Sequence, residues 1–287
     1  MKKIVLMLVL SCSLIGHSQE EVDISKMQIR DEIIYVEDSE KPFTGKIIEK
    51  FENGQIKNEV EYKNGIRHGV YKNYREDGQL TIDNTYENGK MTSTRHYNGS
   101  GQLSWEMVLQ ENSKVEKSYY ENGQLAYEET LVEGMRNGTV KTYYENGQLK
   151  SESTPGEDNN VQVIKNYYEN GQLTSEETLV DGVKNGLTKS YHENGQLAYE
   201  GFLVNNLWNG IVKTYYENGQ LASEGSLIDG QWDGTVKTYY ENGQLRSETS
   251  LVIGVLHGDT NIYSESGELL GTFVYENDKV VQSFLNE

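Results

Sequence analysis

Apolar and polar positions along this chain follow a pattern that restarts every 24 residues. The stretch Tyr-Tyr-Glu-Asn-Gly-Gln-Leu occurs unchanged five times, starting at Tyr119, Tyr143, Tyr167, Tyr215 and Tyr239. A sixth copy, starting at Tyr191, has His192 as its second residue. The central glycines keep 24-residue spacing from Gly123 to Gly267, and looser copies extend back to Gly54. A fixed period of this length predicts a repeat array, here of about ten units.

Each unit predicts a β-hairpin, because Asn-Gly between apolar residues favours a two-residue type I′ turn. Counted from that glycine, such a turn pairs position −3 with +2, −5 with +4 and −6 with +5. Position +2 is Leu or Ile, −7 is mostly β-branched and +8 is often Leu, which predicts one apolar face carrying −7, −3, +2 and +8. A three-residue loop with a bulged glycine is the alternative, and it would pair −4 with +2 and bury the −4 tyrosines. The exposure of Tyr143 and Tyr215 separates the two.

The opposite face of the predicted sheet carries charge and tyrosine. Position −6 is mostly Lys or Arg, +5 is mostly Asp or Glu, and −4 is mostly Tyr. Opposite charges directly across two strands contribute roughly 0.2–1 kcal/mol per pair. The sequence therefore predicts an all-β fold: an elongated, single-layer antiparallel sheet of about ten tandem 24-residue β-hairpin repeats.

The repeat pattern also predicts the domain organisation. The array is expected over residues 32–282, with irregular units near 98–115 and near 154–160, where Pro155 cannot donate to a strand ladder. Residues 19–31 fit no repeat position and are expected to form a linker, and residues 283–287 a C-terminal tail.

Residues 1–18 have the composition of an export signal. Lys2 and Lys3 precede a short apolar run, and the small residues Gly16 and Ser18 have the spacing that signal peptidase uses. We expect cleavage after Ser18 and export to the periplasm, the cell surface or the medium. Lipidation of Cys12 is the alternative. The apolar run is too short to span a bilayer as an anchor.

The unit resembles the bacterial variant of the MORN repeat. Its pattern, Gly-x-x-x-Gly followed by Tyr-Tyr-x-Asn-Gly-x-Leu, is well represented by residues 181–197, and His68-Gly69 and His257-Gly258 are similar to the His-Gly of ordinary MORN units. The resemblance implies β-hairpin repeats in one elongated antiparallel sheet. Proteins built of this variant are similar to the YwqK-type antitoxins, for which the implied role is to bind and neutralise a partner toxin. The resemblance implies no catalytic residues.

Composition points away from catalysis. The five histidines lie far apart with no metal-ligand spacing, and no nucleophile elbow or phosphate loop is present. We therefore expect a non-enzyme without a cofactor or metal. A formal net charge of −19 disfavours nucleic acid and favours a basic partner, although it also serves to keep a thin, exposed sheet soluble.

The candidate binding residues are aromatic. A row of tyrosines on a rigid sheet suits a protein partner, although the same rings could simply cover the sheet. Trp208 and Trp232 occupy the same slot between hairpins in successive units and are expected to form a local hot spot. The candidates are Tyr119, Tyr143, Tyr167, Tyr191, Tyr215, Tyr239, Trp208 and Trp232.

Three functions remain in competition. The first is an exported interaction scaffold that binds another protein through its sheet. The second is an antitoxin or immunity protein that meets a basic toxin. The third is a cell-wall or glycan-binding protein, which the presence of only 3 Trp in the chain disfavours.

Overall fold

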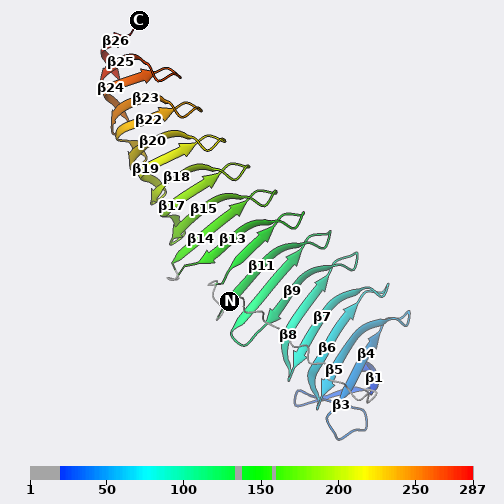
Figure 1. The fold of residues 1–287 in the computed structure, drawn as a ribbon. Helices are drawn as coiled ribbons and strands as arrows, with labels where there is room; N and C mark the ends of the chain where they lie inside the picture. Colours follow the sequence, from blue (N-terminus) through cyan, green and yellow to red (C-terminus); the bar gives the residue numbers. More distant parts are fainter. Residues whose placement is uncertain (1–19, 133–137, 157–159, 287) are drawn as a thin grey trace, which may run out of the picture. The chain divides into compact units, whose positions relative to one another are not determined.

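The computed structural model describes residues 20–132, 138–156 and 160–286. The chain divides into two compact units, one ending at Gly101 and the other beginning at Gln102. Both are built of strands joined by tight turns (Figure 1). Among the described residues, the one helical segment is the 3₁₀ turn Ile24–Lys26. The predicted export signal, residues 1–18, lies outside the described residues.

The first unit is a sheet of successive hairpins, and residues 20–36 pack against its first strands. Strands β4 to β8 pair antiparallel in chain order, β1 lies parallel to β4, and β2 and β3 form a separate hairpin within the range predicted as a linker and the start of the array. The strands are β1 (Glu21–Asp23), β2 (Met27–Arg30), β3 (Ile33–Val36), β4 (Gly45–Lys50), β5 (Ile56–Lys63), β6 (Ile66–Tyr74), β7 (Leu80–Glu87) and β8 (Lys90–Tyr97).

The second unit continues the same design. Its strands pair antiparallel in chain order, except that β16 and β17 both pair with β15, and β21 and β22 both pair with β20 (Figure 1). They are β9 (Leu103–Leu109), β10 (Ser113–Tyr119), β11 (Leu125–Val132), β12 (Val140–Tyr143), β13 (Leu149–Pro155), β14 (Val161–Tyr167), β15 (Leu173–Val180), β16 (Val183–Lys184), β17 (Gly186–Tyr191), β18 (Leu197–Val204), β19 (Leu207–Tyr215), β20 (Leu221–Ile228), β21 (Gln231–Trp232), β22 (Gly234–Tyr239), β23 (Leu245–Val252), β24 (Val255–Tyr263), β25 (Leu269–Glu276) and β26 (Lys279–Leu285). The predicted all-β class and the tandem antiparallel hairpins are confirmed.

The Asn-Gly turns differ from the favoured prediction. At the β12–β13 turn, the Gly147 amide donates to the Tyr144 carbonyl, and the Tyr144 amide donates to the Gln148 carbonyl. Gly147 has φ +84, whereas Asn146 is not among the residues with positive φ. This is the alternative of the sequence analysis, a three-residue loop closed by a glycine bulge, and the type I′ prediction was wrong.

A second bulge restores the predicted charge register. Tyr143 lies opposite Leu149, so −4 faces +2, and then Lys150 at +3 is the extra residue of a bulge. Beyond it, Thr142 faces Ser151 and −6 faces +5, as predicted. The same shift recurs at the corresponding turns of β6–β7, β14–β15 and β19–β20.

The two bulges decide which side chains share a face. Side chains alternate along a strand, so −4, −6, +2 and +5 lie on one face, and −3, −5, −7, +6 and +8 on the other. The apolar residue at +2 therefore shares a face with the Lys and Glu, not with −7 as predicted. We call the first face the Lys face and the second the Trp face, after the residues that distinguish them.

True type I′ turns occur at the other ends of the hairpins. Asp229 and Gly230, between β20 and β21, have φ +48 and +81, and Asn205 and Asn206 have φ +50 and +66. Both central residues of a type I′ turn need positive φ, and Asn, Asp and Gly tolerate it best. In these repeats, bulged turns therefore alternate with type I′ turns.

Burial is shallow throughout the described residues. The first unit has a small core made by the contact of β1 and β3 with the sheet, in which Ile34, Phe43 and Ile47 are at most 7% exposed. In the second unit the buried apolar residues are Leu203, Val212 and Leu227, all on the Trp face. A single layer of this kind depends on contacts between neighbouring hairpins for its stability.

Candidate interaction surfaces

The second tyrosine of each Tyr-Tyr pair, at position −3, bonds one hairpin to the next. The Tyr144 hydroxyl donates to the Tyr167 carbonyl at 2.7 Å, and Tyr216 bonds the Tyr239 carbonyl in the same way. His192 keeps this contact in the one copy that lacks the tyrosine, with Nε2 2.9 Å from the Tyr215 carbonyl oxygen. These side chains therefore hold the array together.

The asparagine of each Asn-Gly has two partners. The Asn146 side-chain oxygen accepts from the Gln148 amide at 2.9 Å, which supports its own turn. The Asn146 amide group donates to the Glu169 carbonyl in the following turn at 3.1 Å. Each turn is thus bonded to the next by one aromatic and one amide side chain.

The first tyrosine of each pair, at −4, belongs to a charged network on the Lys face. Lys213 lies 3.9 Å from Glu224 across the β19–β20 hairpin, and Glu224 also accepts the Tyr239 hydroxyl of the next hairpin at 2.9 Å. Tyr215 bonds Glu200 at 3.0 Å in the same arrangement. Corresponding ion pairs measure 3.4–3.6 Å at Lys117–Glu128, Lys141–Glu152, Lys165–Glu176 and Lys237–Glu248.

This network raises the pKa of the tyrosines Tyr215 and Tyr239. Partial burial disfavours the phenolate, and the hydrogen-bonded carboxylate disfavours it further, so the pKa of Tyr215 rises and that of Tyr239 reaches about 12. The −4 tyrosines predicted as binding residues, namely Tyr119, Tyr143, Tyr167, Tyr191, Tyr215 and Tyr239, are all half-buried.

The two predicted hot-spot tryptophans lie on the Trp face, and each packs against a glycine. A Cβ atom added to Gly201 would lie 2.9 Å from Trp208 Cζ3, and one added to Gly225 would lie 2.8 Å from Trp232 Cζ3. Trp208 also makes an edge-to-face contact with Tyr199 at 5.7 Å between centroids. Both rings are half-buried, and they cover a thin part of the sheet.

An exposed apolar patch, which the sequence analysis did not single out, lies on the Lys face of β17–β20. Leu187 stands directly opposite Phe202, and Val204 opposite Leu207. Phe202 is 53% exposed and Ile211 is 64% exposed. The patch consists of Leu187, Phe202, Val204, Leu207, Ile211 and Ile228.

The sequence held a signal for this patch. At the position of Phe202 the next hairpin has Ser226, and at the position of Ile211 the next has Thr235. Large apolar residues therefore replace small polar ones at solvent-facing sites in these repeats. Contiguous exposed apolar surface of this kind marks interaction sites on proteins.

The described residues provide little else on which chemistry could be built. Nowhere among them do three or more His, Cys, Asp or Glu gather as a metal would require. Within the same residues, no helix has the length and apolar character needed to cross a membrane. The open grooves between successive turns are considered below.

Together, the 24-residue period, the paired turns and the side chains that bond each turn to the next define a tandem β-hairpin repeat protein. The MORN repeat variant matches the chain in eight segments that together span more than half of it: residues 43–64, 67–88, 114–132, 136–154, 163–181, 184–205, 208–229 and 232–251. The chain therefore belongs to the MORN repeat variant family, as the resemblance predicted. No curated protein matches the chain.

Similarity to solved structures is weak. TarM, also solved as an S. aureus mutant in complex with Fondaparinux, alpha-GlcNAc-glycerol and UDP, shows 11% identity at a TM-score of 0.25 over 33% of this chain and 18% of its own. The GtfA/B complex bound to UDP and GlcNAc gives 12% and 0.17 over 43% and 22%. The Photorhabdus luminescens Tc holotoxin pore gives 12% and 0.20 over 79% and 15%. The chain thus spans less than a quarter of the length of each.

Proposed function

We propose that this protein is an exported, non-enzymatic scaffold that binds another protein through the Lys face of its repeat sheet. The apolar patch of β17–β20 is the observation that carries the proposal. Its six side chains come from four consecutive strands, and they lie on one face beside the tyrosine, lysine and glutamate rows.

Exposed apolar surface is unfavourable in water. Removing it from solvent gives a favourable free energy of roughly 25 cal/mol for each Å², so a partner that covers these side chains binds more tightly. The surrounding Lys–Glu pairs form a polar rim around an apolar centre, which is the usual anatomy of a protein interface. A rigid sheet binds without much loss of conformational entropy.

The identity of the partner is a finer question. An antitoxin role is one version of this function, because the net charge of −19 favours a basic protein such as many toxins. A toxin-like gene directly beside this one would support that version. The proposal of protein binding does not depend on it.

The test is an affinity capture with the mature chain, using native envelope and culture medium, at low and high salt. The variant Phe202→Ser/Ile211→Thr replaces the two patch residues by those that the next hairpin carries, Ser226 and Thr235. We expect it to fold and to lose a partner that the unchanged chain retains.

The matched control is Ile262→Thr. Ile262 is an apolar residue 36% exposed on the Trp face, at a position where other hairpins carry Thr142 or Thr214. We expect this variant to keep the partner. Equal capture by the patch variant and the unchanged chain would refute the assignment, and retention of cell-wall sugar alone would favour glycan binding instead.

A further inference from the structure

Grooves between successive Asn-Gly turns open in both units of the chain, at the turns around Gly54, Gly147 and Gly219. The groove around Gly219 is lined by Tyr216, Glu217, Asn218 and Glu241, the last belonging to the following turn. The groove around Gly147 has the equivalent lining. Each contains an aromatic ring at −3 and two glutamates at −2 from successive turns.

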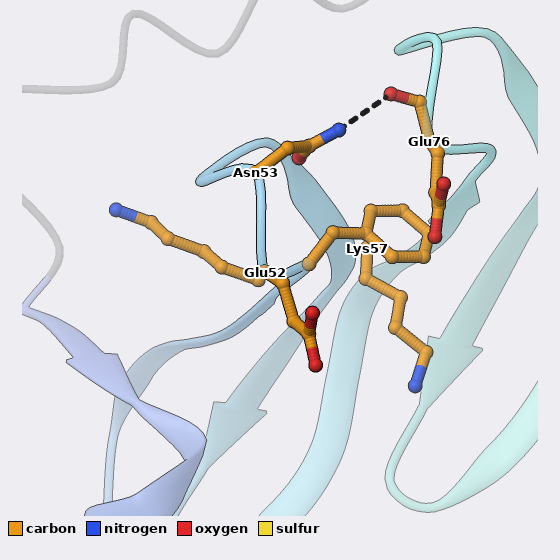
Figure 2. Close-up of a pocket in the computed structure, with 6 residues that line it drawn as sticks. Glu52, Asn53, Lys57 and Glu76 are labelled. Carbon is orange, nitrogen blue, oxygen red and sulfur yellow. Dashed lines mark hydrogen bonds between the residues drawn. The ribbon is translucent and has the colours of Figure 1, made fainter.

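The groove of the first unit has a lysine in its lining. Figure 2 shows Glu52 and Glu76 as the two glutamates, the Asn53 side chain bonded to the Glu76 carbonyl, and Lys57 beside them. The Lys57 ammonium itself pairs with Glu49, which does not line the groove, at 2.7 Å. Phe51 supplies the aromatic ring. Lys57 stands at position +3, the residue pushed out by the second bulge.

Two hairpins of the second unit also supply their own cation from +3. Lys150 Nζ lies 5.5 Å from the centroid of the Tyr144 ring, and Arg246 Cζ lies 5.7 Å from that of Tyr240. Both distances are within the range of cation–π attraction. The chain itself therefore shows that a Lys or Arg side chain fits against the −3 ring.

Four other hairpins of the second unit, around Gly123, Gly171, Gly195 and Gly219, keep the ring and the glutamates but carry a small residue at +3. Ala222 stands where the neighbouring hairpin has Arg246, although Tyr216, Glu217 and Glu241 are all present. The other three small residues at +3 are Ala126, Thr174 and Ala198. In the hairpin around Gly195 the ring is that of His192.

We propose that the grooves with a small residue at +3 bind the Lys or Arg side chains of an extended basic segment of the protein partner. This inference rests on the proposed protein-binding function and names the chemistry of the partner. The ring would hold the cation through its face, and the two glutamates would neutralise its charge.

The spacing of the grooves specifies the segment. Successive turns are two strands apart, which is about 10 Å at roughly 4.8 Å per strand. A polyproline II segment has 3 residues per turn and rises about 3.1 Å per residue, so every third side chain lies on the same face about 9 Å apart. The matching ligand therefore carries Lys or Arg at every third residue.

The experiment measures binding of two synthetic peptides to the full mature chain by calorimetry at physiological salt. One peptide has four lysines at every third position, separated by Pro and Ser, and the other has the same composition with the lysines adjacent. We expect the spaced peptide to bind at least about fivefold more tightly, because only it can fill successive grooves with rings and carboxylates.

The decisive variant is Ala222→Lys, which gives this groove its own cation as Lys150 does in another hairpin. We expect the affinity for the spaced peptide to fall about five- to tenfold. Lys150→Ala should raise it, because it frees the Tyr144 ring from the cation that the chain itself supplies. Thr235→Lys adds the same charge on the Lys face, away from the grooves, and should change the affinity less than about twofold.

Equal weakening by Ala222→Lys and Thr235→Lys, or equal binding of the two peptides, would mean that only the overall negative charge attracts the ligand, and the inference would be overturned. The Phe202→Ser/Ile211→Thr variant should bind the spaced peptide normally. If that variant loses the captured partner while Ala222→Lys has no effect on the spaced peptide, protein binding stands and the groove assignment fails.

Discussion

The contact between Trp232 and Gly225 predicts that Gly225→Ala destabilises the unchanged chain but stabilises a chain that lacks Trp232. Gly225 lies in strand β20 and is not among the glycines with positive φ, so alanine meets no backbone strain there. Only space opposes it: the new Cβ would lie 2.8 Å from Trp232 Cζ3 and 2.9 Å from Val236 Cγ2. Both are well inside ordinary carbon–carbon contact of about 3.5–4.0 Å.

The magnitude follows from two opposing terms. Overpacking of this kind costs about 1–3 kcal/mol, whereas replacing glycine by alanine in an open strand stabilises by roughly 0.5–1 kcal/mol. Gly225→Ala should therefore destabilise the native chain by about 1–2 kcal/mol. In a Trp232→Ala background the same substitution should stabilise by about 0.5 kcal/mol. The valine does not prevent this, because Ser153 stands opposite the β-branched Ile164 of the following hairpin, the equivalent pair in a repeat without tryptophan.

The assay is native-state hydrogen exchange of the β20 and β22 amides, because a repeat array can unfold in segments and a global midpoint would average them. Four proteins complete the cycle: the unchanged chain, each single variant and the double variant. Ser153→Ala serves as the control and should change stability by less than about 0.5 kcal/mol. An equal cost of Gly225→Ala with and without the tryptophan would refute the steric argument.

Three further predictions concern the turns and the tyrosines. Gly123→Ala should lower the stability measured by thermal unfolding by about 1–2 kcal/mol, because φ is +84 and an added Cβ would meet no atom within 4 Å, so that backbone strain alone is measured. Gly123→Asn should cost less, because Asn tolerates positive φ, and an equal cost of the two variants would contradict this. Tyr168→Phe loses the 2.8 Å bond to the Tyr191 carbonyl and should cost about 0.5–1.5 kcal/mol by urea denaturation; no loss would show that the bond is dispensable. Because the native pKa of Tyr239 is about 12 and free tyrosine titrates near 10, its contribution is complete below about pH 10 and is lost as the pH rises toward 12; Tyr239→Phe should flatten alkaline unfolding in that window, and an unchanged profile would refute it.

The period, the strand class and the charge pairing could be predicted from the sequence because they depend on local rules that every unit repeats. The turn could not, because Asn-Gly is compatible with two loops. What decides between them is tertiary: the Asn146 side chain is held by the following turn, through the Glu169 carbonyl. Two compensating bulges then leave the −6/+5 register unchanged, so the charge pattern alone carried no information about the turn.

The packing of the two tryptophans was missed for a different reason. Trp208 and Trp232 were predicted as a hot spot because they do not recur in the other repeats and share one slot in two successive units. The structure places both against glycines of the same sheet, a contact that the sequence analysis did not predict. The signal was present in the same hairpins, since Gly201 and Gly225 occupy +6 only where tryptophan follows seven residues later. The pairing becomes visible only when positions on neighbouring strands are compared, which a reading along the chain does not do.

The bonds that stitch one turn to the next also govern how such a gene can change. Each tyrosine or asparagine reaches an acceptor 23 residues further on, so an insertion of one or two residues would misplace the donors before it relative to the acceptors after it in the same repeat. Duplication or loss of a complete 24-residue block leaves every donor opposite a carbonyl. The final Asn-Gly-like turn has Ser264 and Ser266 at the two donor positions, and no further turn of this type follows it in the sequence. Length in this lineage is therefore expected to vary in whole units, with the number of partner grooves varying in step.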